Sequence, residues 1–189
     1  PHRHGAEVFV RVWAWLKEKE RRIGAGEEDG RRKAEELKGA RGRVVAIAKK
    51  VARAREDGVR QLFINGISFE PQEAGYCAEF VREVYEAALG LPAYTWPYRG
   101  RSAREMERKL KAAGKAIAAE RRQPGDIVAF NRAWPSRWGH VAIYLGKDAR
   151  GQDLAAEDTR RGICINPIGA RRWHISGWYS VLPADAGGY

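Results

Sequence analysis

Cysteine is scarce in this sequence, with only Cys77 and Cys164 among 189 residues. Two cysteines are too few for a disulfide framework in a chain of this length, which excludes the small secreted domains that several disulfides hold together. A single Cys77–Cys164 bridge remains compatible with the count. The alternative is that each cysteine is a free thiol. The residues around it then indicate whether its role is structural or chemical.

Long hydrophobic runs are absent as well. No apolar run approaches the roughly 18 residues of a membrane-spanning helix, so no membrane span is expected. The first twenty residues contain basic residues and a short apolar patch, but the patch includes Arg11 and lacks a small-residue cleavage site, so we expect no signal peptide. Apart from His2 and His4, which flank Arg3, no metal-site spacing occurs, and we expect neither a metal nor a cofactor.

Acidic residues are outnumbered by basic ones. The chain has 24 Asp and Glu against 35 Lys and Arg, a formal net charge of +11, and residues 1–60 are its most basic part. Such a charge suits a polyanionic partner, which could be nucleic acid, an anionic cell wall or an acidic membrane surface. Charge alone leaves the choice among these partners open.

The N-terminal third is predicted to be helical. Residues 5–22 have apolar side chains around most of a helical circumference, so this helix should be covered on two sides. A second helix is predicted over residues 31–56, with interruptions at Gly39 and Gly42. We therefore divide the chain into an N-terminal helical extension, 1–42, and a second domain, 43–189.

The segment 75–89, GYCAEFVREVYEAAL, predicts an amphipathic helix that begins near Cys77. Its apolar and small residues recur at helical spacing, in the order Cys77, Phe80, Val81, Val84, Tyr85 and Ala88. A helix N-terminus carries partial positive charge and unpaired N–H groups, which favour the thiolate form of a cysteine in the first turn. Cys77 is therefore a candidate nucleophile, and the N–H groups of Cys77 and Ala78 are candidates to hold an oxyanion.

Short strands with tight turns follow from residue 115 onward. The predicted strands are 127–130, 140–146, 154–158, 163–165 and 174–182. Helices followed by a run of short strands indicate an α+β domain whose helices pack on an antiparallel sheet. The β-rich segment 62–69, with its central Asn-Gly, is too short on either side to predict a hairpin.

A histidine and two acids complete a possible catalytic set. Strand alternation places His140 and Ala142 on one face, and we expect the Cys77 helix to pack on that face, where the small Ala142 leaves room. A cysteine hydrolase also needs a polar group to orient its histidine. Glu157 and Asp158 are the candidates, and alternation points them to opposite faces, so only one of them can serve unless a bulge intervenes.

Four blocks of the sequence resemble the CHAP (cysteine, histidine-dependent amidohydrolase/peptidase) and NlpC-type domains. They are GYCAEFV, PGDIVAF, WGHVAIYLG and AAEDTRRG, and the similarity covers roughly residues 43–183. The resemblance implies a papain-like fold, with Cys77 as nucleophile, His140 as base and Glu157 or Asp158 as orienting residue. The chain departs from the family in two ways: the AAEDTRRG block contains neither an Asn nor a His, and Tyr76 replaces the Asp or Gln that commonly precedes the cysteine.

The resemblance further implies a cysteine amidase or endopeptidase that cuts an amide bond of peptidoglycan, as a phage endolysin or tail-associated lysin does. Such an enzyme acts at the bacterial cell wall after release or delivery, by phage or by non-classical secretion. The expected partner is peptidoglycan, with an anionic wall polymer held by the basic N-terminal helices and no nucleic acid. Loop and motif positions favour four aromatic residues as substrate contacts: Tyr76, Trp96, Trp134 and Trp138.

Two other functions fit the same sequence. A catalytically inactive basic module would bind nucleic acid or an anionic wall polymer, and an interbacterial toxin amidase would use the same chemistry in another setting. Cys164, within Ile-Cys-Ile, is predicted to be a buried thiol, and His174 a structural histidine.

Overall fold

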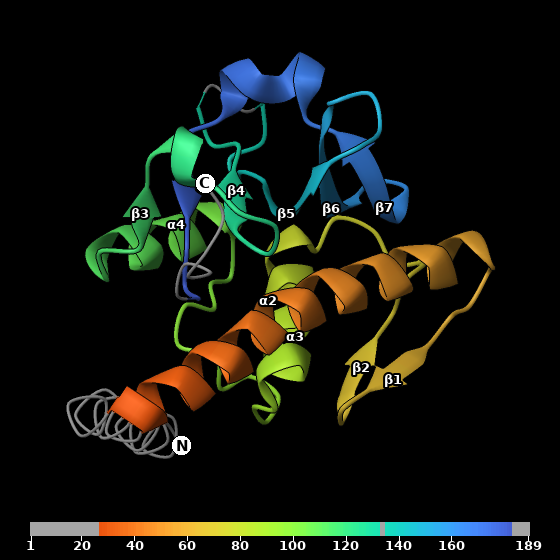
Figure 1. The fold of residues 1–189 in the computed structure, drawn as a ribbon. Helices are drawn as coiled ribbons and strands as arrows, with labels where there is room; N and C mark the ends of the chain where they lie inside the picture. The colour runs from red at the N-terminus through yellow and green to blue at the C-terminus, as the bar shows by residue number, and fades with distance from the viewer. Residues whose placement is uncertain (1–26, 133–134, 183–189) are drawn as a thin grey trace, which may run out of the picture.

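The computed structural model describes residues 27–132 and 135–182. The predicted helix 5–22, His2, His4 and Trp134 lie outside the described residues. Figure 1 shows the order of the elements along the chain. They are α2 (Glu27–Glu56), β1 (Leu62–Ile64), β2 (Ile67–Phe69), α3 (Cys77–Leu89), α4 (Ala103–Ala112), β3 (Ala116–Ile117), η2 (Ala119–Arg121), β4 (Ile127–Ala129), β5 (Val141–Lys147), β6 (Asp153–Thr159), β7 (Gly162–Pro167), η3 (Gly169–His174) and β8 (Gly177–Tyr179).

The main sheet has six strands in the order β3-β8-β4-β5-β6-β7, and each neighbouring pair is antiparallel. The predicted α+β class, with helices packed on an antiparallel sheet, is confirmed. Strands β1 and β2 form a separate hairpin, which the sequence analysis did not predict. Its turn consists of Asn65 and Gly66, both with positive φ (51° and 79°), and these residue types adopt that conformation most readily.

Helix α2 is continuous, so the predicted interruptions at Gly39 and Gly42 are wrong. Packing explains the difference, because Ala40 is buried in the core and the buried Arg41 pairs with Asp126 at 2.8 Å. These contacts stabilise helical backbone where glycine alone disfavours it. The boundary after residue 42 lies inside this helix, and the division into two domains remains a prediction.

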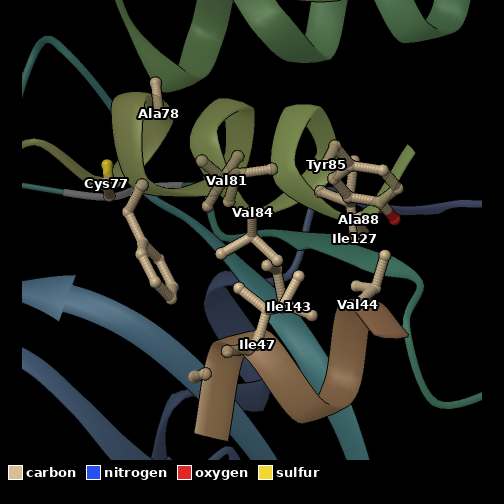
Figure 2. Close-up of a cluster of buried hydrophobic side chains, with 14 of the residues drawn as sticks. Val44, Ile47, Cys77, Ala78, Val81, Val84, Tyr85, Ala88, Ile127 and Ile143 are labelled. Atoms are coloured by element: carbon tan, nitrogen blue, oxygen red, sulfur yellow. The ribbon is translucent and has the colours of Figure 1, made fainter. Parts of the chain in front are cut away.

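Helix α3 crosses α2, and both helices pack against the main sheet, α3 on β5 and β6 and α2 on β5, β6 and β7 (Figure 1). Figure 2 shows its buried stripe, in which Val81, Val84 and Tyr85 face side chains of α2, β4 and β5. Burial of each large apolar side chain contributes about 1.5–3 kcal/mol, so this stripe fixes the position of α3 and of Cys77 at its start. The helix ends at Gly90, which has left-handed geometry with φ 65°.

The face of the sheet that α3 covers differs from the prediction. Val141 and Ile143 of β5 share the core with α3, whereas Ala142 and Tyr144 belong to a second cluster on the opposite face. The expectation that α3 packs on the face of His140 and Ala142 is therefore wrong. The apolar side chains at 141 and 143 offer α3 more surface to bury than the small Ala142 does.

The C-terminal part contains a turn of helix where a strand was predicted. Residues 169–174 form the 3-10 helix η3, and the strand that follows, β8, is limited to 177–179. Helix α4 begins after the cap residue Ser102, whose hydroxyl accepts a hydrogen bond from the Glu105 N–H at 3.2 Å. Helix α4 and η3 both contribute residues to the cleft described next.

Candidate active site

Cys77 is the first residue of α3, as predicted. Tyr76 occupies the N-cap position without a side-chain hydrogen bond to the first turn, so that turn has no side-chain cap. The Asp158 carboxylate instead accepts hydrogen bonds from the N–H groups of Gly75 (3.1 Å) and Tyr76 (2.7 Å). The loop before the thiol is thereby fixed, and the amides of Cys77 and Ala78 stay available to a ligand.

His140 lies one residue before β5, and its backbone is held from the side by Asn131. Asn131 Oδ1 accepts from the His140 N–H at 2.9 Å, and its Nδ2 donates to Glu107 at 2.7 Å. Gly139 has φ +75°, and a Cβ at this position would lie 1.9 Å from Asn131 Oδ1. Only glycine fits here, which explains the Gly-His pair in the sequence.

The His140 ring connects Cys77 to Glu157. Its Nε2 makes a short hydrogen bond to Glu157 Oε2, and the same ring interacts with the Cys77 thiol. Burial disfavours the imidazolium, but the hydrogen bonds to Cys77 and Glu157 outweigh burial and raise the pKa of His140 to about 9. The geometry therefore favours a protonated His140 beside the thiol at neutral pH.

Glu157 is buried and fully hydrogen-bonded. Asn166 donates to Oε1 at 2.8 Å, and Arg171 lies 2.6 Å from Oε2, the oxygen that His140 also contacts. Burial alone would raise the pKa of Glu157, but the hydrogen bonds from His140 and Arg171 dominate and lower it to about 2. Glu157 is thus ionised across the physiological range.

The structure distinguishes the two acidic candidates. Glu157 and Asp158 point to opposite faces, as alternation predicted, and only Glu157 hydrogen-bonds the His140 ring. Asp158 is not the orienting residue, because its two oxygens hold the loop before Cys77. The structure therefore brings Cys77, His140 and Glu157 together, and their catalytic role stays a prediction.

Sequence reasoning missed two partners of Glu157. Asn166 lies two residues after Cys164 on β7, and Cys164 pairs with Glu157 across the strands, so all three side chains share one face. Alternation along 163–167 could have identified Asn166. Arg171 had no comparable signal, because it reaches Glu157 from η3, a segment without strand or helix periodicity in the sequence.

Cys77 and His140 open onto a cleft of about 1570 Å³. Tyr76 and Trp138 line it and are 55% and 56% exposed, and their role as substrate contacts stays a prediction. Trp96 does not line the cleft, so its prediction is wrong: it is 2% exposed and stacks on Tyr85 with ring centroids 4.9 Å apart. An aromatic residue in a proline-rich loop packs inward when a neighbouring ring can cover it.

The second cysteine also lines the cleft. Cys164 is half-buried rather than buried as predicted, and its sulfur lies 3.1 Å from Asn166 Nδ2. Both cysteines are free thiols, so the Cys77–Cys164 bridge is not formed. His174 is buried and its Nδ1 contacts the Arg132 carbonyl at 2.9 Å, consistent with a structural histidine.

Two kinds of feature are missing from residues 27–132 and 135–182. No cluster of three or more His, Cys, Asp or Glu side chains there has the arrangement of a metal site. No helix in these segments has the length and hydropathy to span a bilayer.

Comparisons with known proteins give a family match for part of the chain. Residues 68–154 match the CHAP domain, a segment that contains Cys77 and His140 and ends before Glu157. An NlpC/P60 family protein from Bacillus cereus ATCC 10987 is a similar solved structure, with 24% identity and a TM-score of 0.39. The match covers 57% of this chain and 32% of that one. No curated protein matches the sequence.

Proposed function

We propose, from the match of residues 68–154 to the CHAP domain, that this protein hydrolyses an amide bond of peptidoglycan through the Cys77 thiol. The observation that carries the proposal is the continuous contact from Cys77 through His140 to a buried, ionised Glu157. This is the arrangement a cysteine hydrolase needs: a nucleophile, a proton carrier and a group that orients it.

The chemistry follows from this arrangement in two steps. The Cys77 thiolate attacks the carbonyl carbon of the scissile amide, the amide N–H groups of Cys77 and Ala78 hold the oxyanion, and the C–N bond breaks as protonated His140 gives its proton to the leaving amine. Water then attacks the thioester with His140 accepting its proton, which releases the acid and the thiolate. Glu157 stays ionised throughout and holds the imidazole in orientation.

The proposed site of action is the bacterial cell wall, reached after release or delivery from a phage or a producing cell. A phage endolysin or tail-associated lysin is the setting we propose first, and a toxin amidase would use the same chemistry. The net charge of +11 supports either setting, because the wall carries negative charge that attracts a basic enzyme.

A digest of defined muropeptides, read by mass spectrometry, tests the proposal and identifies the bond that is cut. The wild-type protein should release a peptide or amine, and Cys77→Ala should abolish release while leaving the circular dichroism spectrum unchanged. Cys164→Ala is the matched control, since it removes the other thiol of the cleft and should still turn over the substrate.

Equal release by wild type and Cys77→Ala would contradict the proposal. If the wild type releases nothing but is retained on DNA or on an anionic wall polymer in a salt-dependent way, the protein is instead a basic binding module.

A further inference from the structure

The cleft that contains Cys77 is strongly cationic. Among the described residues that line it, eight side chains are basic and three are acidic. Five of the basic ones lie within ion-pair distance of no carboxylate of the described chain: Arg55, Arg99, Arg101, Arg160 and Arg161. The cleft therefore has cationic groups available to a ligand.

The three acids of the cleft are already engaged. Glu79 pairs with Arg82 at 2.9 Å, and Glu105 pairs with Lys109 at 3.3 Å. Asp158 accepts from the two backbone N–H groups before Cys77. Because Glu79 and Glu105 already have cationic partners, Asp158 leaves one negative charge against the five free arginines, and an anionic ligand would meet net positive charge.

Three of the free arginines meet at the turn between β6 and β7, beside the nucleophile. The Thr159 carbonyl accepts from the Gly75 N–H at 3.2 Å, which places Arg160 and Arg161 next to the loop that leads into Cys77. Arg55, at the end of α2, donates from Nε to the Arg161 carbonyl at 3.0 Å and lines the same wall of the cleft.

This turn is held in place on several sides, so its charges have a defined position. The Ile163 N–H donates to the Pro71 carbonyl at 3.1 Å. Gly162 has φ +82°, and a Cβ there would lie 2.7 Å from the same carbonyl. Arg160 and Arg161 are exposed at this turn and Arg55 beside them is half-buried, so their side chains are accessible to a ligand.

We propose that Arg160, with Arg55 and Arg161, forms a carboxylate-binding subsite that selects peptide substrates with a free carboxylate close to the scissile amide. A guanidinium binds a carboxylate through two parallel hydrogen bonds, and a neutral amide at the same place leaves the charge unpaired. The inference rests on the proposed function, in which the anionic groups of the substrate are the carboxylates of a stem peptide. To that function the subsite adds a preference for stem peptides with a free carboxylate near the cut bond.

The test compares two muropeptides that differ only in whether the stem-peptide carboxylates near the cut bond are free or amidated. We expect wild-type kcat/KM to be roughly ten- to a hundredfold higher for the free acid, the factor that loss of a charge-assisted hydrogen bond produces. Arg160→Ala should remove most of this preference for the free acid. Arg160→Lys keeps the positive charge but cannot make the two parallel hydrogen bonds, so it should retain part of the preference. Arg150→Ala, in the β5–β6 turn outside the cleft, is the control and should keep the wild-type ratio.

Each outcome decides the proposal. Equal wild-type rates on the two peptides, or an equal loss on both peptides in Arg160→Ala, would overturn the subsite while the proposed hydrolase remains. If wild type cuts neither peptide, the proposed function fails, and calorimetric binding of both peptides to Cys77→Ala tests the subsite separately. Tighter binding of the free acid would sustain it, and equal or absent binding would overturn it.

Discussion

Arg171 and His140 contact the same oxygen of Glu157. Arg171 Nη1 lies 2.6 Å from Oε2, and His140 Nε2 makes a short hydrogen bond to that atom. The guanidinium helps to keep Glu157 ionised and at the same time offsets part of its negative charge toward His140. Arg171 is therefore suited to position Glu157 and to limit how strongly His140 holds its proton.

Replacement of Arg171 by Ala should lower kcat/KM about tenfold, because Glu157 loses one of its three partners. The alkaline limb of the pH–rate profile should move to higher pH, since a positive charge near His140 is removed. A pH–rate profile measures both effects. Arg172→Ala, an exposed neighbour on η3, is the control, and identical profiles for the two variants would contradict a positioning role for Arg171.

Glu157→Ala and Asp158→Ala should differ in what they damage. Loss of Glu157 should reduce kcat by about 10²–10⁴-fold, because the imidazole loses its orienting partner. Loss of Asp158 should have a smaller effect on kcat but lower the free energy of unfolding by about 1–3 kcal/mol, since two loop N–H groups lose their acceptor. Kinetics and denaturant titrations on both variants test this, and a larger kcat loss for Asp158→Ala would be incompatible with Glu157 as the orienting residue.

Gly139→Ala and Gly151→Ala form a matched pair, because both glycines have φ +75°. At Gly151 the added methyl meets nothing within 4 Å, so we expect only the backbone cost of about 1–2 kcal/mol. At Gly139 the methyl would overlap Asn131 Oδ1 and displace it from the His140 N–H, so stability and activity should both fall further. Thermal melts and turnover assays measure the difference. Equal effects at the two sites would show that Asn131 does not hold His140 in place.

The pair of Glu157 and His140 should make folding stability depend on pH at both the acid and the alkaline end of the range. The pKa of Glu157 falls on folding from 4.5 to about 2, so its contribution is present above pH 4.5 and is lost as the pH falls toward 2. The pKa of His140 rises from 6.5 to about 9, so its contribution is present below pH 6.5 and is lost as the pH rises through 9.

In Glu157→Gln the loss of folding stability at acid pH should be smaller than in the wild type. The difference should be on the order of 3 kcal/mol or less between pH 5 and 2. Urea titrations at a series of pH values measure it. Parallel stability curves for wild type and variant over this range would mean that the Glu157 pKa is not lowered by folding.

Local pattern was enough to predict α3, the position of Cys77 in its first turn, and His140 at the head of β5. Helical periodicity and glycine turns lie within a few residues of these sites, so neighbouring side chains specify them. The same reasoning gave the α+β class and the opposite orientations of Glu157 and Asp158, because alternation follows from strand geometry alone.

Tertiary structure decided the rest. Which face of the sheet α3 covers, which acid meets His140, and the arrival of Asn166 and Arg171 at Glu157 all depend on segments that are distant in sequence or lack periodicity. Trp96 is buried because Tyr85, on another element, stacks against it. The sequence by itself therefore determined where the nucleophile and the histidine stand along the chain. Packing determined which groups surround them, because burial and hydrogen bonding between distant segments are settled only when those segments meet.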